Sequence, residues 1–276
     1  MEIIQLILNG IMSGTILAVP AIGLTVIFAV LRFTNFALAS HMTIGAYAGF
    51  VANTMLGLPV IPSLVAAFVV AGFVGWLTDE FVLKPLRASG FITTAIGSIA
   101  LTIGLENIVR FVFGNQMRGY DLPVMRDWRF SNGLHVSPQQ VESLLIAIIV
   151  MGLLFSFLSM TRIGKAMRAV ADNPTLAAIK GIDADLIARL VSFVGMGLAG
   201  LGGMLIGLDT TIDPLVGFRT VLTIFAAAVV GGLGSIPGAV VGALAIGIGE
   251  ELSLLVLSPV WQHPLDGRRP GAPDDH

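Results

Sequence analysis

The sequence of 276 residues contains no cysteine and only four histidines, which are His41, His135, His263 and His276. Without cysteine the chain can form neither a disulfide bond nor a thiolate metal site, and the histidines are too scattered to predict a metal site. The sequence also lacks the G-x-x-x-x-G-K-[ST] phosphate loop, the G-x-S-x-G nucleophile motif and the H-E-x-x-H metal motif. We therefore expect no catalytic residue, no bound cofactor, no metal and no enzyme activity.

Charge is scarce as well. Only 12% of the residues are charged, and the net charge of −2 gives no reason to expect a nucleic-acid partner. Hydrophobic residues make up 55% of the chain, which is more than a soluble core requires. A bilayer core about 30 Å thick is crossed by about 20 apolar residues of helix, and runs of this kind recur along the chain. We therefore predict a multi-pass membrane protein with membrane lipid as a partner.

Eight membrane spans are predicted, at residues 4–30, 37–56, 60–83, 93–113, 141–160, 187–208, 218–234 and 237–258. Because lipid cannot hydrogen-bond an exposed backbone, these spans are expected to be helices. The span 218–234 is short enough to be a broken or re-entrant helix. The prediction is an all-α, polytopic transmembrane helical bundle over residues 1–258, followed by a polar, disordered tail at 259–276.

Basic residues predict the orientation of the bundle. Segments 84–87 and 161–189 are rich in lysine and arginine, so both are expected on the cytoplasmic side, with Met1 and the segment 114–140 outside. The arginines of segment 114–140 run against this bias. The N-terminus lacks the basic region of a secretory signal, so we interpret residues 4–30 as a retained first span.

Small residues recur four positions apart within the spans. The pairs and triplet are Gly10/Gly14, Gly45/Gly49, Gly203/Gly207 and Gly234/Gly238/Gly242. This spacing places them on one helix face and allows close approach of backbones, so we expect tight packing within the bundle, with a gating or subunit contact as the alternative. Two similar glycine-rich stretches, NFALASHMTIGAYAG and TIFAAAVVGGLGSIPGAVVGA, hint at an internal repeat.

Residues 161–185, TRIGKAMRAVADNPTLAAIKGIDAD, are polar in an otherwise apolar chain. Asn173 is a favoured N-cap residue, Pro174 suits the first position of a helix, and Gly181 can adopt the positive φ that ends one. We predict a helix of about two turns from Pro174 to Lys180. Because an isolated helix of this length is not stable in water, something must hold it.

Two interpretations of this segment stay open on physical grounds. As an inert basic loop, its cations would meet anionic lipid headgroups. As a docking element, Ala177 and Ala178 would offer a flat surface, flanked by the apolar Leu176 and Ile179, to a cytoplasmic protein. The segment is longer than a connection between spans requires, which favours docking.

Several motifs in order resemble the permease subunits of high-affinity branched-chain amino acid ABC transporters. They are TNFALASHMTIGAYAG, TRIGKAMRAVADNPTLAAIKGID, GMGLAGLGGML and FAAAVVGGLGSIPGAVVGA, and the resemblance covers about residues 5–258. In that family the segment equivalent to 161–186 contains the coupling helix, which docks on the ATPase subunits. The resemblance implies an ATPase-coupling role for Arg162, Lys165, Arg168, Ala169, Asn173, Ala177, Ala178 and Gly181.

The same resemblance implies an inner-membrane permease subunit that forms the path for branched-chain or related amino acids. Its implied partners are two cytoplasmic ATP-binding subunits, a second permease subunit, identical or different, and a periplasmic solute-binding protein. ATP would be bound by the partner subunits only. Loops 114–140 and 209–219 would receive the binding protein.

Candidate residues of the translocation path come from the early signature and from one charged position in a span. They are Asn35, Phe36, Gly45, Tyr47 and Glu106. Asn35 is also a candidate cap for the second span. Glu106 and Arg110 are one helical turn apart, so they could pair along one face, and a role of Glu106 in the solute path is the alternative.

Two departures from the family pattern matter. Relatives have a His-Gly-acidic triplet where this chain has Leu38, Ala39 and Ser40, so the solute stays open among amino acids, amides and urea. Relatives also end in a further apolar span, whereas this chain departs after Pro259, which leaves a truncated or frameshifted end open. The competing functions are a self-sufficient, ion-coupled transporter or channel for a small polar solute such as urea, and a membrane scaffold.

Overall fold

The computed structural model describes residues 2–122, 128–129 and 135–262, and this part of the chain is almost entirely helical. The first half contains α1 (Glu2–Leu31), α2 (Leu38–Phe50), the π-helix η1 (Val51–Met55), α3 (Val60–Thr78), the π-helix η2 (Asp79–Leu83), α4 (Lys84–Arg87) and α5 (Phe91–Phe113). The second half contains α6 (Pro138–Met160), α7 (Arg162–Asp172), α8 (Pro174–Ile179), α9 (Ala184–Asp209), α10 (Val216–Gly231) and α11 (Ile236–Gln262). A two-residue antiparallel pair, β1 (Trp128–Arg129) with β2 (His135–Val136), lies between α5 and α6. The predicted all-α class is confirmed.

Six helices are long and apolar enough to cross a bilayer, within the part of the chain that the structure describes. They are Ile3–Leu31, Val60–Arg87, Phe91–Phe113, Pro138–Met160, Ala184–Asp209 and Ile236–Ser253. The predicted polytopic bundle is confirmed, and six of the eight predicted spans correspond to these helices. The span predicted as short, 218–234, corresponds to α10, whose 16 residues extend about 24 Å, and the predicted span 37–56 corresponds to α2 and η1.

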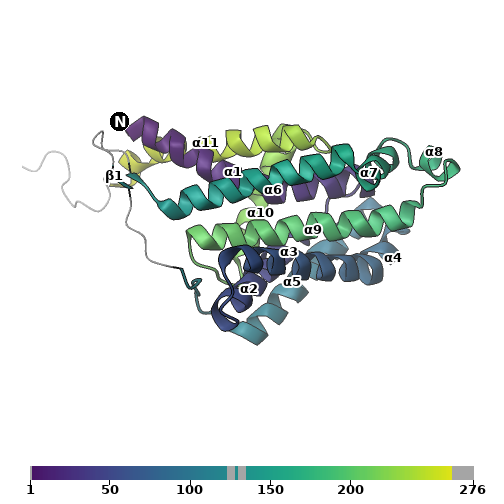
Figure 1. Ribbon diagram of the computed structural model, residues 1–276, viewed down its shortest axis with the longest axis horizontal. Coiled ribbons are helices and arrows are strands. Elements are labelled where there is room, and N and C mark those ends of the chain that lie inside the picture. The colour runs from purple at the N-terminus through teal and green to yellow at the C-terminus, as the bar shows by residue number, and fades with distance from the viewer. Residues whose placement is uncertain (1, 123–127, 130–134, 263–276) are drawn as a thin grey trace, which may run out of the picture.

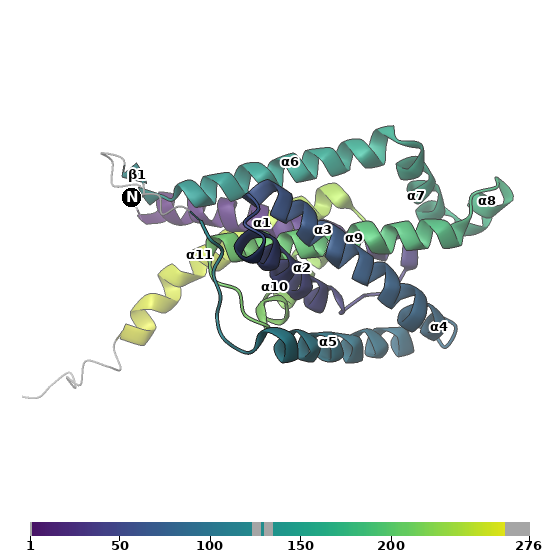
Figure 2. The same ribbon diagram turned by 60° about the horizontal axis from the view of Figure 1, so that its bottom comes forward.

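The helices are arranged so that the two basic segments lie at the same end of the molecule. Helices α1, α6 and α9 run along its long axis, with α4, α7 and α8 at one end and the N-terminus and β1 at the other (Figure 1). Helix α10 runs across this axis and is seen almost end-on in Figure 2. We call the two ends of the bundle the α8 end and the β1 end.

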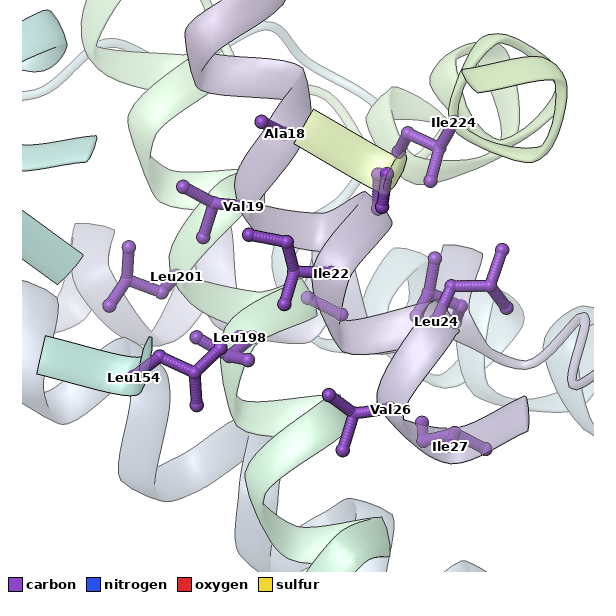
Figure 3. Close-up of a cluster of buried hydrophobic side chains, with 14 of the residues drawn as sticks. Ala18, Val19, Ile22, Leu24, Val26, Ile27, Leu154, Leu198, Leu201 and Ile224 are labelled. Carbon is purple, nitrogen blue, oxygen red and sulfur yellow. The ribbon is translucent and has the colours of Figure 1, made fainter. Parts of the chain in front are cut away.

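The core is centred on α1 and α9. In each of these helices 78% of the most apolar stretch is buried, against 22% in α5 and α6, whose outer faces are left for lipid. Figure 3 shows the side chains of Val19 and Ile22 from α1 between Leu198 and Leu201 of α9, Leu154 of α6 and Ile224 of α10. The peripheral helices therefore pack around α1 and α9, which we call the frame.

The glycines of the frame support the packing interpretation. Gly45 of α2 lies against the backbone of Gly200 in α9, and Gly14 of α1 lies against Ala243 and Leu244 of α11, so that a Cβ at either glycine would collide with the neighbouring helix. In lipid, close contact of this kind supplies much of the attraction between helices. Gly234 is the exception in the predicted set, since it has φ +95° in the turn before α11.

Helix α11 continues to Gln262, beyond the predicted end of the last span. Residues 263–276, which include most of the predicted disordered tail, lie outside the described residues. The prediction for this tail therefore stays a prediction.

Candidate coupling segment and translocation path

The candidate coupling segment, residues 161–186, which we call the coupling segment, begins with the amphipathic helix α7. The Thr161 side chain caps this helix by accepting a hydrogen bond from the Gly164 N–H at 3.0 Å. Met167 and Val170 are buried against the bundle. The predicted cations of this helix, Arg162, Lys165 and Arg168, are all exposed, and Ala169 is half-buried. Helix α7 therefore lies on the α8 end of the bundle with its charges directed away from the core.

Helix α8 has the predicted caps. The Asn173 side chain accepts a hydrogen bond from the Leu176 N–H at 2.9 Å, and Gly181 has φ +82°. The N–H groups of Gly181 and Ile182 then bond to the Ala178 and Ala177 carbonyls at 2.9 and 3.0 Å, which is the Schellman pattern of a helix C-terminus. The predicted two-turn helix is confirmed, with its end one residue earlier, at Ile179.

One detail of the predicted docking surface is corrected. Ala177 is only 3% exposed because it faces the bundle, so it cannot offer a surface to a partner. Leu176 is 54% and Ile179 is 76% exposed, and Ala178 is exposed beside them. Figures 1 and 2 both show α8 projecting beyond the other helices. The available surface is therefore a small apolar tip on a capped, protruding helix.

Two residues outside the predicted set fix this segment to the frame. The Arg32 guanidinium donates a hydrogen bond to the Ala171 carbonyl at 2.6 Å and so joins the end of α1 to α7. The Asp183 carboxylate accepts from the N–H groups of Asp185 and Leu186 at 2.9 and 3.2 Å and so caps α9. The Asp183 cap could have been predicted, because an acidic residue just before an apolar helix is a common helix-start signal. The contact between Arg32 and Ala171 could not, because these residues are 139 positions apart in the sequence.

A stripe of polar residues on α5 faces the protein interior. Its members are spaced one per turn and are all buried, namely Thr94, Ser98, Thr102 and Glu106. The other side of α5 exposes large apolar residues, including Ile92, Ile96 and Ile103. A helix with this distribution directs its polar side away from lipid, and such intramembrane polar groups mark functional positions. We call these four residues the α5 stripe.

The α5 stripe holds the non-helical residues 32–37 that lead into α2, which we call the start of α2. The Ser98 hydroxyl accepts a hydrogen bond from the Phe36 N–H at 3.0 Å, and the Thr102 hydroxyl donates to the Phe36 carbonyl at 3.0 Å. The Asn35 side chain accepts from the Ala37 N–H at 3.0 Å, but the predicted cap is wrong, because the N-cap residue of α2 is Ala37 and no side chain caps this helix. The Phe36 ring stacks on Phe225 of α10, with 4.8 Å between centroids. Irregular backbone at membrane depth is tolerated where it is buried in protein or lines a wet cavity.

The remaining predicted path residues occupy two different environments. Glu106 is buried beside this region, and its Oε1 atom has no hydrogen-bond partner among the described residues. No ion pair joins it to Arg110 within the described chain, so the predicted pairing is wrong. Tyr47 is buried against Phe113, with 4.7 Å between ring centroids. Gly45 is accounted for by its contact with Gly200.

The sequence analysis did not predict Thr94, Ser98 and Thr102 as site residues, although their regular spacing was a signal for them.

At the β1 end, the two loops predicted to receive a solute-binding protein, 114–140 and 209–219, are joined by backbone hydrogen bonds. Arg118 and Ile212 exchange backbone hydrogen bonds of 2.9 Å in both directions. The Tyr120 hydroxyl donates to the Ala46 carbonyl at 2.9 Å, and burial raises the pKa of this phenol, so it remains a donor. Asp213 forms an ion pair with Arg219 at 2.7 Å. This end of the bundle is thus tied to α2.

Comparison with known proteins identifies the chain. A family model described as branched-chain amino acid transport system / permease component matches residues 6–265. The chain belongs to this family of transport permeases. Membership makes it a multi-pass membrane permease, homologous to permeases of the bacterial inner membrane, and not an enzyme. In such systems ATP is bound by a partner ATPase, so membership implies that the permease works in a complex with other components of the transporter.

Individual relatives extend along most of the permease. The high-affinity branched-chain amino acid transport system permease protein LivH of Escherichia coli (strain K12) is 32% identical over 94% of this chain and 88% of its own length. The corresponding protein BraD of Pseudomonas aeruginosa is 30% identical over 90% of this chain and 85% of its own. A probable branched-chain amino acid transport permease protein LivH of Methanocaldococcus jannaschii is 32% identical over 93% and 83%. No solved structure matches the permease.

Proposed function

We propose that this permease forms the membrane path of an ABC importer for branched-chain amino acids, over residues 1–258. Two cytoplasmic ATP-binding subunits would drive it through residues 161–186. The observation that carries the proposal is the apolar tip of α8, where Leu176 and Ile179 are exposed on a short helix held by its own caps. A helix of this size gains nothing from exposing two large apolar side chains to water unless a partner covers them.

The proposed path runs between the α5 stripe and the start of α2. A zwitterionic amino acid needs a polar but weakly binding route, because a tight site would not release it. The α5 stripe offers three hydroxyl groups and one carboxylate, while Asn35 and Phe36 offer backbone and amide groups opposite to it. Phe36, Tyr47 and Glu106 stay in the proposed path with Asn35, and Gly45 is assigned to packing.

The proposed outer partner is a solute-binding protein that contacts the β1 end. The hydrogen-bonded loops at Arg118 and Ile212 support this assignment, since they form one continuous surface joined to α2 by Tyr120. A second permease subunit would complete the path. Both partners are inferred from the family and from relatives described as parts of high-affinity branched-chain amino acid transport systems.

One observation favours the competing function of an ion-coupled transporter. Glu106 is a buried carboxylate with an oxygen atom that has no partner, and such groups carry protons or ions in secondary transporters. The two functions differ in their energy source. An importer transports only with its ATP-binding subunits, whereas a secondary transporter works alone on an ion gradient.

A crosslinking experiment tests the docking of α8. Because the chain has no cysteine, Ile179→Cys introduces a unique site for a thiol-reactive photocrosslinker in native membranes. We expect it to capture an ATP-binding subunit. Leu56→Cys, at a position that is 68% exposed and directly follows η1, serves as the matched control and is expected to capture none. Absence of an ATP-binding subunit from the products of position 179 would refute the proposal.

A further inference from the structure

A cluster of four charged side chains joins the turn after α3 to the beginning of α9. Arg189 of α9 binds Glu80 of η2 in a bidentate manner, with Nε to Oε2 at 2.9 Å and Nη2 to Oε1 at 3.1 Å. Lys84 of α4 bridges the two elements, because its Nζ donates to Glu80 at 3.1 Å and to Asp185 at 3.2 Å. Asp185 lies at the end of the segment 161–186, whereas Glu80, Lys84 and Arg189 lie outside that segment and outside the proposed path.

The neighbouring carboxylate holds the same turn from inside. Asp79 is 3% exposed and forms an ion pair with Arg87 of α4, whose guanidinium lies 5.4 Å from the centre of the Phe33 ring. Both carboxylates of η2 therefore bind α4, Asp79 through Arg87 and Glu80 through Lys84, and Glu80 also binds Arg189 of α9. Single π-turns such as η2 occur frequently at functional sites.

The position of the cluster connects α8 to the α5 stripe. Asp185 and Arg189 lie in the first turns of α9, directly after the Asp183 cap that follows α8. On the other side, Leu86 of α4 contacts Gly97 of α5, which is the neighbour of Ser98 in the stripe. A displacement of α8 thus has a continuous route through α9, Glu80 and α4 to the helix that holds the start of α2.

We propose that Glu80 and Arg189 are positioning residues that make the α8–α9 corner and the η2–α4 turn move as one body. This inference rests on the proposed function, because it assumes that ATP-binding subunits displace α8. A bidentate Arg–carboxylate pair suits this role, since its two parallel hydrogen bonds fix orientation as well as distance. Glu80 is also partly shielded, with 22% of its side chain exposed.

The alternative is that the cluster only stabilises the folded permease, since α3 and α9 already pack directly through Gly75 and Met196. Measurements of coupling distinguish the two roles. Permease variants would be reconstituted with the ATP-binding subunits and the binding protein, and leucine uptake would be measured together with ATP hydrolysis and with crosslinking through Ile179→Cys. A purely stabilising cluster would change none of these once the amount of folded protein is matched.

We expect Glu80→Gln and Arg189→Gln each to reduce leucine uptake per ATP hydrolysed by roughly fivefold to tenfold, with crosslinking to the ATP-binding subunit unchanged. The double variant should be no worse than the poorer single variant, because both changes remove the same contact. Glu142→Gln, which alters an exposed carboxylate at the start of α6, is the matched control and should leave the ratio unchanged. Unchanged coupling in the single variants, or fully additive losses, would overturn the proposal.

A covalent tether gives a second test, in which the readout is the recovery of coupling on crosslinking. Glu80→Cys combined with Arg189→Cys should couple poorly when reduced and recover when a short bifunctional thiol reagent joins the two positions. Uptake that falls on tethering would overturn the proposal, because the elements would then have to separate during transport. If the parent complex showed no ATP-dependent uptake and no crosslink from position 179, the proposed function itself would fail. The positioning role proposed for Glu80 and Arg189 would then fail with it.

Discussion

The coupling segment and the start of α2 are both short irregular regions, yet they are held in opposite ways. In the coupling segment, the Asn173 side chain reaches a backbone group three residues away. At the start of α2, the hydroxyls that bind the Phe36 backbone come from residues 62 and 66 positions away, on α5. The first region is specified by local contacts, whereas the second depends on a neighbouring helix. Under the proposed function, the part that docks would be locally specified and the part that lines the path would be held from outside.

The largest effect is expected from breaking the frame under both regions. Gly45→Leu would force a side chain into the backbone of Gly200, which the surrounding packed helices cannot absorb. We expect more than tenfold less folded permease in membranes and an uptake close to zero, measured by size-exclusion of the detergent-solubilised protein and by leucine uptake. Gly104→Leu is the control, because Gly104 of α5 has no atom near its Cβ position, and it should fold normally. Equal behaviour of the two variants would contradict the close packing of α2 on α9.

Thr102→Val tests the long-range contact at the start of α2. The substitution keeps the shape of the side chain but removes the donor to the Phe36 carbonyl, and a buried carbonyl without a partner costs about 1–3 kcal/mol. We expect a lower thermal stability and a change in uptake. Thr93→Val removes a hydroxyl from the exposed side of the same helix and should do neither. A permease that tolerates both changes equally would show that α5 does not hold α2.

Asn173→Ala tests the local contact in the coupling segment. Loss of an N-cap costs about 1 kcal/mol of helix stability, so α8 should fray while the rest of the bundle stays folded. We expect weaker association with the ATP-binding subunits at unchanged thermal stability of the permease. Asn173→Asp retains an acceptor for the Leu176 N–H and should preserve association. Loss of binding in the aspartate variant as well would show that the cap is not what matters at this position.

Ile179→Ser should have the smallest effect on the permease and a clear effect on its partner. Because the side chain is 76% exposed, its removal should change the stability of the isolated permease by no more than about 0.5 kcal/mol. Association with the ATP-binding subunits should weaken, since one of the two apolar contacts of α8 is lost. Unchanged binding affinity, or a loss of affinity matched by an equal loss of thermal stability, would contradict the proposed docking role.

The contrast between the two regions also explains what could be predicted from the sequence. The caps at Asn173 and Gly181 are local, so the two-turn helix was predicted to within one residue. The regular spacing of Thr94, Ser98 and Thr102 was visible, but the carbonyl that Thr102 binds could not be inferred without knowing which helices are neighbours. The spacing places Glu106 and Arg110 one turn apart on α5 but does not set the geometry of their side chains, and no ion pair joins them among the described residues. Glu80 and Arg189, 109 positions apart, could not be joined by any pattern of spacing.

Leucine uptake into proteoliposomes, with ATP-binding subunits added or withheld, tests most directly whether energy enters this permease through α8. We expect uptake only when the ATP-binding subunits and ATP are present, and we expect its loss in Ile179→Asp although the permease variant remains folded. Uptake by the permease alone on an ion gradient, or undiminished ATP-driven uptake by Ile179→Asp, would contradict the entry of energy through α8.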